Sequence, residues 1–201
     1  MDINSGDDYA LRLSAKNGHL EVVRYLVEQG ADIHTDNDNP LRYSAQEGHI
    51  NVVRYLIEHG ADIHAYNDNS LSYSARNGHL EVVRYLIEQG LDINAEDNFA
   101  LSWSAHNGHL NVVRYLIENG VDIHADNDNA MRYSAKSGHL DMVRYLVEHG
   151  SPAEIGIAAA SKQPNVLAWL EGYQQSREEQ KQLLKHVKNT ITSSISHKNR
   201  I

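Results

Sequence analysis

A repeat of thirty residues constrains the fold of this chain more than any other feature. The dipeptide Gly-His recurs five times at a constant interval, at Gly18, Gly48, Gly78, Gly108 and Gly138. The tripeptide Arg-Tyr-Leu has the same period, beginning at Arg24, Arg54, Arg84, Arg114 and Arg144. A fixed period of roughly 20 to 50 residues is typical of solenoids, in which each unit packs only against its neighbours. The sequence therefore predicts a stack of similar units.

The signals within one unit indicate two short helices. Asn39 is a good N-cap and Pro40 suits the first helical turn, while Gly48 supplies a left-handed residue that ends this helix. Residues 50–58 carry apolar side chains at helical spacing, and Gly60 closes this second helix. A brief extended piece and an Asn-Asp-Asn turn then lead to the next unit. Because one unit cannot bury its apolar face alone, the copies must stack.

The order of these motifs resembles the ankyrin repeat over residues 1–150. The resemblance rests on Gly-His-(Leu/Ile)-x-(Val/Met)-Val followed by Leu-(Ile/Val)-Glu-x-Gly-x-Asp-Ile. The family unit has about 33 residues and a Thr-Pro-Leu-His-x-Ala signature, whereas this one reads Asn-Pro-Leu-Arg-Tyr-Ser-Ala at its best. The resemblance implies an all-α, ankyrin-type helix-turn-helix solenoid with shortened hairpin loops and an extra C-terminal helix. The short unit is similar to ankyrin arrays of giant viruses of amoebae and of some intracellular bacteria.

The two ends of the array depart from the repeat. A repeat remnant, Asp2-Ile3-Asn4, precedes five units at about 8–37, 38–67, 68–97, 98–127 and 128–150. Residues 151–172 match the fifth unit at a shift of 24 and are predicted to form a divergent capping repeat. Residues 173–201 are predicted to form an amphipathic helix with a frayed end. This helix could pack on the cap, pair with another chain or dock a partner.

Composition and charge narrow the classes of protein. The chain has no cysteine, no basic-then-apolar leader and no long apolar segment, so we expect a cytoplasmic or nuclear protein. Residues 173–201 contain six Lys or Arg and two Glu, a net charge of +4, so residues 1–172 carry −13 of the total of −9. An acidic array disfavours nucleic acid and favours a partner protein with a basic surface.

No constellation of catalytic, cofactor-binding or metal-binding residues is recognised. The histidines of the Gly-His steps lie one repeat apart, so they cannot converge on one ion. Asp36-Asn37-Asp38-Asn39 lacks the downstream Gly and Glu of a calcium loop and is interpreted as a turn with an N-cap. An active site needs different groups meeting at one point, whereas a repeat presents the same groups in a line. The chain is therefore not expected to be an enzyme.

Comparison of the copies separates scaffold from candidate surface. The invariant Arg-Tyr positions are interpreted as packing between repeats. Positions on the first helix vary, and the resemblance implies that they face the concave groove, where partners bind. The predicted partner-binding residues, which include an aromatic row, are Arg42, Tyr43, Gln46, Tyr66, Tyr73, Arg76, Phe99, Trp103, His106, Arg132, Tyr133 and Lys136.

The fourth unit departs most from the others. Phe99 stands where the third unit has Asn69, and Trp103 where it has Tyr73. With His106 these residues share one helix face, since they are spaced by four and three. We interpret this apolar spot as a partner contact, although Phe99 could instead fill space left by a local difference in the loop.

Three functions remain open at this point. The first is a protein-protein interaction module, for example a viral or bacterial factor that engages a host protein through its concave groove. The second is a self-assembling structural scaffold that forms a homo-oligomer through the C-terminal helix. The third is nucleic-acid binding by the basic tail, which predicts salt-sensitive affinity.

Overall fold

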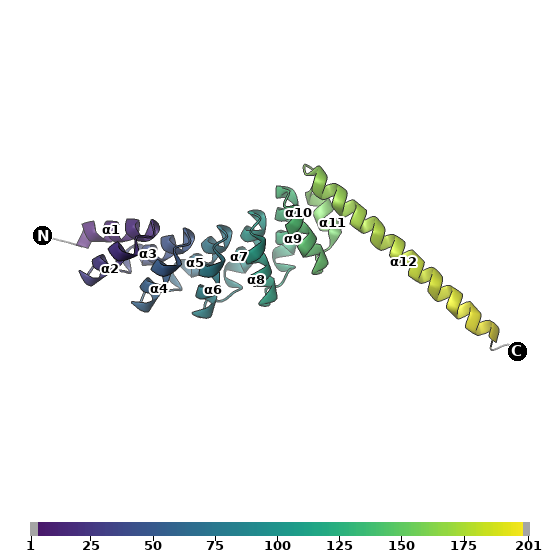
Figure 1. Cartoon of the computed structure of the whole chain (residues 1–201), viewed down its shortest axis with the longest axis horizontal. Coiled ribbons are helices and arrows are strands. Elements are labelled where there is room, and N and C mark those ends of the chain that lie inside the picture. Colours follow the sequence, from purple (N-terminus) through teal and green to yellow (C-terminus); the bar gives the residue numbers. More distant parts are fainter. Residues whose placement is uncertain (1–3, 199–201) are drawn as a thin grey trace.

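The computed structural model describes the backbone of residues 4–198 and the side chains of residues 8–66, 68–94 and 99–191. Over residues 4–198 the chain consists of helices and short turns, without a β-strand (Figure 1). The predicted helix-turn-helix solenoid is therefore confirmed. The first helices of the successive units are α1 (Asn4–Lys16), α3 (Thr35–Gln46), α5 (Ala65–Arg76), α7 (Ala95–His106), α9 (Ala125–Ser137) and α11 (Ala153–Ala159). The second helices are α2 (Leu20–Glu28), α4 (Ile50–Glu58), α6 (Leu80–Glu88), α8 (Leu110–Glu118), α10 (Leu140–Glu148) and α12 (Pro164–Lys198).

The first helices pack side by side in one layer, and the second helices form another along the same axis (Figure 1). Small residues allow the first helices to lie close together: Ser74 and Ala75 are fully buried, as are their equivalents in the neighbouring units. The Ser74 hydroxyl donates to the carbonyl of Leu71 at 2.9 Å, which satisfies the buried oxygen.

The core is a repeated set of aliphatic side chains. In the third unit Leu71, Val83 and Leu86 are all fully buried, and the equivalent residues of the adjoining units lie against them. Each such side chain stabilises the fold by about 1.5–3 kcal/mol through removal of apolar surface from water. The core therefore extends as one continuous strip along the stack.

The loop between units is a left-handed turn in place of a β-hairpin finger. Asp36, Asn37 and Asp38 have φ of 50°, 57° and 56°, and the right-handed part of α3 begins at Asn39. Asp and Asn tolerate this region because their short polar side chains hydrogen-bond locally. Asp38 also hydrogen-bonds to the next unit, because its Oδ1 accepts the backbone N–H of Asp62 at 3.0 Å. The turn predicted from Asp36-Asn37-Asp38-Asn39 is thus confirmed.

The Gly-His step forms a joint between repeats. Each histidine ring lies against the glycine of the preceding unit, so a Cβ at Gly18 would come within 2.5 Å of the His49 ring. His49 Nε2 also lies 2.9 Å from the carbonyl of Lys16 at the end of α1. In the capping unit Gln163 takes the place of the histidine and donates to the carbonyl of Lys136 at 3.1 Å.

The C-terminal region differs from the sequence-based division at residue 173. The second helix of the capping unit continues without a break as α12, which reaches Lys198, so the expected boundary falls inside one helix. Residues 174–191 are exposed, and α12 projects away from the stack instead of folding back on the cap (Figure 1). Residues 174–182 are good helix formers with almost no apolar side chain to bury, which explains both findings. None of the described helices is long and apolar enough to cross a membrane.

Two of the predicted boundaries lie partly outside the described residues. The remnant at residues 1–3 is not described, and α1 already begins at Asn4. The helix continues to Lys198 through the region expected to fray, and residues 199–201 lie outside the description.

Candidate protein-binding surface

The twelve residues predicted to bind a partner all lie on the first helices α3, α5, α7 and α9. None of them is buried, and they share the exposed side of this layer. We call this face the first-helix surface and define it by residues 39–46, 69–76, 99–106 and 129–137, together with Tyr66. The sequence therefore predicted which side chains of this layer reach solvent.

A continuous row of stacked side chains crosses three units of the first-helix surface. The Arg76 guanidinium lies 4.7 Å from the centre of the Trp103 ring, a cation–π distance. Trp103 meets His106 edge-on at 5.6 Å, and His106 meets Tyr133 in the same manner at 5.5 Å. Trp103 and Tyr133 each remain 37% exposed. The row thus presents aromatic surface to solvent in fixed positions.

A hollow of about 240 Å³ opens between α5 and α7 at the end of this row. Asn69, Ser72, Tyr73 and Arg76 line it from α5, and Phe99 and Trp103 line it from α7. Ser72 is the most buried of these residues at 6% exposure and forms the floor, while Phe99 remains 44% exposed at the rim.

Two departures from the repeat create this hollow. At the position of Ser72 the second and fifth units carry the long side chains Arg42 and Arg132, so serine leaves space. At the position of Phe99 the neighbouring units carry asparagine, so phenylalanine makes one wall apolar. The hollow therefore arises where a small residue in one unit meets a large apolar residue in the next. The alternative explanation for Phe99 was that it fills space left by a local difference in the loop. Its ring instead borders open space, which argues against that explanation.

The opposite end of the first-helix surface is organised by Arg42. Its guanidinium lies 4.1 Å from the Tyr66 ring centre and 5.5 Å from that of Tyr43, and it also donates to Asn39. Tyr66 has a φ of 56°, a left-handed backbone that costs energy for a bulky residue. Lys16 of α1 lies over Tyr43 at 5.5 Å.

The remaining predicted residues do not join either group. Gln46 contacts Glu47, which follows α3, and Arg132 Nε donates to the carbonyl of Asn127 at 2.9 Å. Lys136 is exposed at the end of α9. The predicted set of partner-binding residues left out Lys16, Asn69 and Ser72, although the position of Ser72 varies between copies and so belongs to the candidate surface.

The charge of the first-helix surface is opposite to that of the array as a whole. Residues 9–16 of α1 and the four segments of the surface contain six Lys or Arg and no Asp or Glu. Most of the acidic residues that give residues 1–172 their negative charge lie in the turns and on the second helices, and a few, such as Asp8 of α1 and Glu154 of α11, lie on the outermost first helices. Arg12 is paired with Asp36 at 2.8 Å, but no carboxylate among the described residues lies within ion-pair distance of Arg76.

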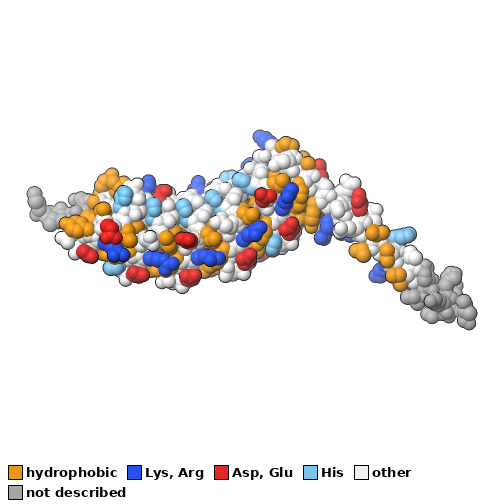
Figure 2. Space-filling view, in the orientation of Figure 1, with side chains coloured by type: hydrophobic (Ala, Val, Ile, Leu, Met, Phe, Trp, Pro, Cys, Tyr) orange, Lys and Arg blue, Asp and Glu red, His pale blue; other side chains and the backbone are white. Residues whose placement is uncertain are grey.

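The invariant Arg-Tyr series forms a second row on the other layer. Arg24, Arg54, Arg84 and Arg114 each lie over the tyrosine of the next unit, at 4.2–5.5 Å. Arg144 lies over Trp169 in the same way, at 5.5 Å. Figure 2 shows basic and acidic side chains side by side along this edge of the stack. These contacts confirm that the series packs repeats together.

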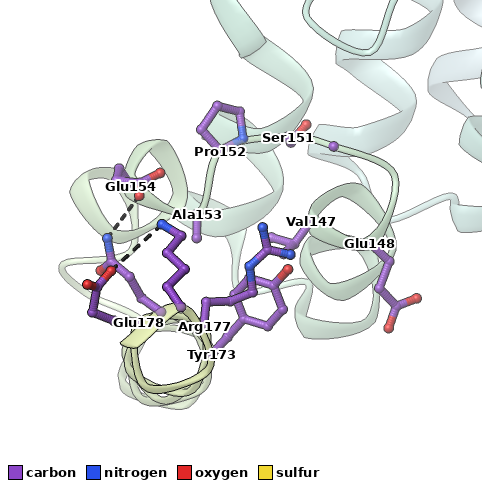
Figure 3. Close-up of a pocket in the computed structure, with 12 residues that line it drawn as sticks. Val147, Glu148, Ser151, Pro152, Ala153, Glu154, Tyr173, Arg177 and Glu178 are labelled. Atoms are coloured by element: carbon purple, nitrogen blue, oxygen red, sulfur yellow. Dashed lines mark hydrogen bonds and ion pairs between the residues drawn. The ribbon is translucent and has the colours of Figure 1, made fainter. Parts of the chain in front are cut away.

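The outer half of α12 exposes a separate apolar stripe. Leu184, Val187 and Ile191 are 45–69% exposed and follow at helical spacing the stripe that begins with the buried Leu170 and reaches Tyr173 (Figure 2). At the root of this stripe Tyr173 points toward the end of α10 (Figure 3). A hollow of about 370 Å³ lies between α12 and the turn before α11, and Gln174 donates to Glu154 across it at 2.9 Å.

The loop histidines pair with carboxylates. The Nδ1 atoms of His34, His64 and His124 lie 3.0, 2.8 and 2.7 Å from the Asp four residues later. Each pair sits in its own turn, one repeat from the next. No group of three or more His, Cys, Asp or Glu side chains that could hold a metal occurs among the described residues. Each pair therefore stabilises its own turn by joining the residue before the turn to the Asp at its end.

Comparison with known proteins gives one finding. A family model described as ankyrin repeats in three copies matches residues 11–97 and, in a second overlapping placement, residues 71–159. Together the matches span residues 11–159, which contain the latter part of α1 and all of α2 to α11 but no part of α12. No curated protein matches the sequence.

Proposed function

Because the chain belongs to the ankyrin repeat family, we propose that it binds a partner protein through its first-helix surface. Ankyrin repeats are generally protein-protein interaction modules and typically not enzymes. Fold alone does not fix function, so the proposal depends on the features of this surface.

The observation that supports the proposal is the row from Arg76 through Trp103 and His106 to Tyr133. Trp, Tyr and Arg are the residues that most often dominate binding energy at interfaces. Their mutual stacking holds them in place before a partner arrives, which lowers the entropy lost on binding. The row also contains the positions at which the fourth unit departs from its neighbours, so it is a local feature rather than a consequence of the repeat.

A substitution that borrows from the third unit tests this proposal. Phe99→Asn combined with Trp103→Tyr gives the fourth unit the residues that the third unit has at Asn69 and Tyr73. The fold is retained because the chain already stacks a unit with these side chains. We expect capture of partner protein from a host lysate to fall at least tenfold, since one hot-spot residue contributes about 2 kcal/mol or more.

The matched control is Glu81→Gln, an exposed residue on α6 in the second-helix layer. This variant should capture the partner as the unchanged chain does. Equal capture by the double variant, with an unchanged circular dichroism spectrum, would show that the first-helix surface is not where the partner binds.

A second candidate function is self-assembly through α12. It is favoured by the exposed stripe of Leu184, Val187 and Ile191, which continues the face that packs on the capping unit. Exposed apolar residues at this spacing suit a helix-helix interface. Light scattering after size exclusion should give a multiple of 22.6 kDa for the unchanged chain. Substitution of the three residues by Gln should restore the monomer mass; a monomer in both cases would remove this candidate.

The proposed setting is intracellular. The absence of cysteine from the sequence supports it, because a reducing compartment makes disulfides unusable. Fractionation of cells that express the tagged chain should place it in the cytoplasm or nucleus, and recovery from the medium would contradict this proposal.

A further inference from the structure

Two polar groups of the hollow between α5 and α7 are available to a ligand, the Ser72 hydroxyl and the Arg76 guanidinium. The Ser72 hydroxyl is buried and forms no hydrogen bond. A buried polar group left unpaired costs roughly 1–3 kcal/mol, so native proteins rarely leave one without a reason. Arg76, at the rim, stacks on Trp103 and has no carboxylate within ion-pair distance among the described residues. Both groups lie beside the apolar walls made by Phe99 and Trp103.

We propose that this hollow receives an apolar side chain from an acidic peptide segment of the partner, with a neighbouring carboxylate paired to Arg76. The apolar side chain packs against Phe99 and Trp103 of α7, and a polar group of the segment completes the hydrogen bonding of Ser72 on α5. This inference rests on the proposed function, because it specifies the kind of protein segment that the first-helix surface binds.

The size of the hollow favours one side chain over a small-molecule ligand. Pockets for small molecules usually measure about 300–1,000 Å³ and enclose most of the ligand. This hollow measures about 240 Å³ and is open on one side, with two of its walls half exposed. It can therefore anchor a single side chain of a chain that continues across the surface.

The charges around the hollow favour an acidic segment. Arg42 lies on one side of it along the first-helix surface, and Arg132 and Lys136 lie on the other. Among residues 8–66, 68–94 and 99–191, whose side chains the structure describes, no carboxylate forms an ion pair with any of these residues. Opposite charges steer association and fix register. The net charge of the array suggested a basic partner, but the carboxylates that produce it lie outside the four segments of the first-helix surface, mostly in the turns and on the second helices.

The same carboxylates disfavour a nucleic acid as the occupant. Asp36, Asp68 and Asp126 border the first-helix surface from the turns at the start of α3, α5 and α9. A continuous phosphate backbone would pass close to them, whereas a short acidic peptide can place its carboxylates at the basic positions alone. Repulsion between like charges therefore selects the shorter, locally charged ligand.

The test is selection of a random dodecapeptide phage library on the full chain, followed by affinity measurement with the selected synthetic peptides. We expect the enriched peptides to share a Leu, Phe, Tyr or Trp within three residues of an Asp or Glu. Their affinity should fall at least tenfold for Arg76→Gln, which removes the charge, and for Ser72→Met, which fills the hollow without adding charge. Arg76→Lys should retain part of the affinity, since the charge remains but the planar stacking is lost. Glu81→Gln should bind as the unchanged chain does.

The outcomes separate this inference from the proposed function. Peptides that need Trp103 but are basic or neutral, and that bind Arg76→Gln and Ser72→Met normally, would overturn the acidic occupant and leave the surface as the binding site. Peptides indifferent to all these changes, or no enrichment, would overturn both. A fluorescent single-stranded oligothymidylate that bound more tightly than the peptides, in an Arg76-dependent manner, would also overturn the acidic peptide.

Discussion

Replacement of Gly108 by alanine should destabilise the stack more than replacement of Gly120 in the same unit. Both glycines are left-handed, with φ of 79° and 96°. An L-residue in this region costs roughly 1–2 kcal/mol, and this cost is common to the two variants. A Cβ at Gly120 would meet no atom within 4 Å, whereas a Cβ at Gly108 would lie 2.8 Å from the His139 ring.

The added cost at Gly108 comes from displacing that ring. His139 Nε2 lies 2.8 Å from the carbonyl of His106, which ties the fifth unit to the fourth. Loss of this hydrogen bond costs about 0.5–1.5 kcal/mol. Gly108→Ala should therefore lower the free energy of unfolding by roughly 1 kcal/mol more than Gly120→Ala does.

Urea unfolding followed by circular dichroism measures the difference, provided that the variants share the same dependence on urea. A double-mutant cycle with His139→Ala isolates the contact, because the added cost should disappear once the ring is absent. Equal destabilisation by the two alanines, or an added cost that persisted without the ring, would refute the role of the Gly-His joint in coupling the repeats.

Three further predictions concern other contacts between repeats, at His79, Tyr85 and Arg54. Burial lowers the pKa of His79, with smaller contributions from His109 and His49, so the stability it contributes is present above about pH 6.5 and lost as pH falls through the lower folded value. His79→Gln, which imitates Gln163, should match the unchanged chain at pH 8 and lose less stability at pH 5 in urea titrations; a parallel loss would contradict this. Burial raises the pKa of Tyr85, so its contribution is present below about pH 10 and lost as pH rises through the higher folded value. Tyr85→Phe should therefore reduce the alkaline loss seen by circular dichroism, and an unchanged alkaline transition would count against it. Arg54, which lies 4.2 Å from the Tyr85 ring centre, should contribute about 0.5–1 kcal/mol, measured as the difference in unfolding free energy between Arg54→Ala and the unchanged chain.

The parts of the fold that recur could be predicted from the sequence. Helical spacing in residues 50–58 and the glycines that close each helix predicted the helix pair, whereas the Asn39 oxygen, expected to cap a helix, accepts from the Arg42 side chain. The left-handed turn at Asp36 could not be predicted in detail, because turn residues indicate a turn without its backbone angles. The extent of α12 was also missed, since a polar helix past the cap gives no sign of whether it folds back.

In the candidate site, too, the sequence predicts what recurs in every unit but not what depends on the contact between two particular residues. Exposure of the twelve surface residues followed from their positions in the repeat, because every copy places the same helix face toward solvent. The hollow depends on Ser72 and Phe99, which are 27 residues apart and belong to different units. Only stacking brings them together, so neither residue alone predicts the cavity.

Repetition also changes how charge should be interpreted in this chain. The net charge of residues 1–172 averages over the first-helix surface, whose four segments carry Lys and Arg but no Asp or Glu, and over the turns and second helices, where most carboxylates lie. A partner that lies along the first helices meets Arg42, Arg76, Arg132 and Lys136 directly, whereas Asp36, Asp68 and Asp126 lie at the edge of this surface. Exposed charges are screened within about 10 Å at ordinary salt, which is roughly the thickness of one helix layer. The proposed binding mode therefore predicts that a rise in salt weakens an acidic peptide held by Arg76 while leaving the apolar contact with Trp103 in place.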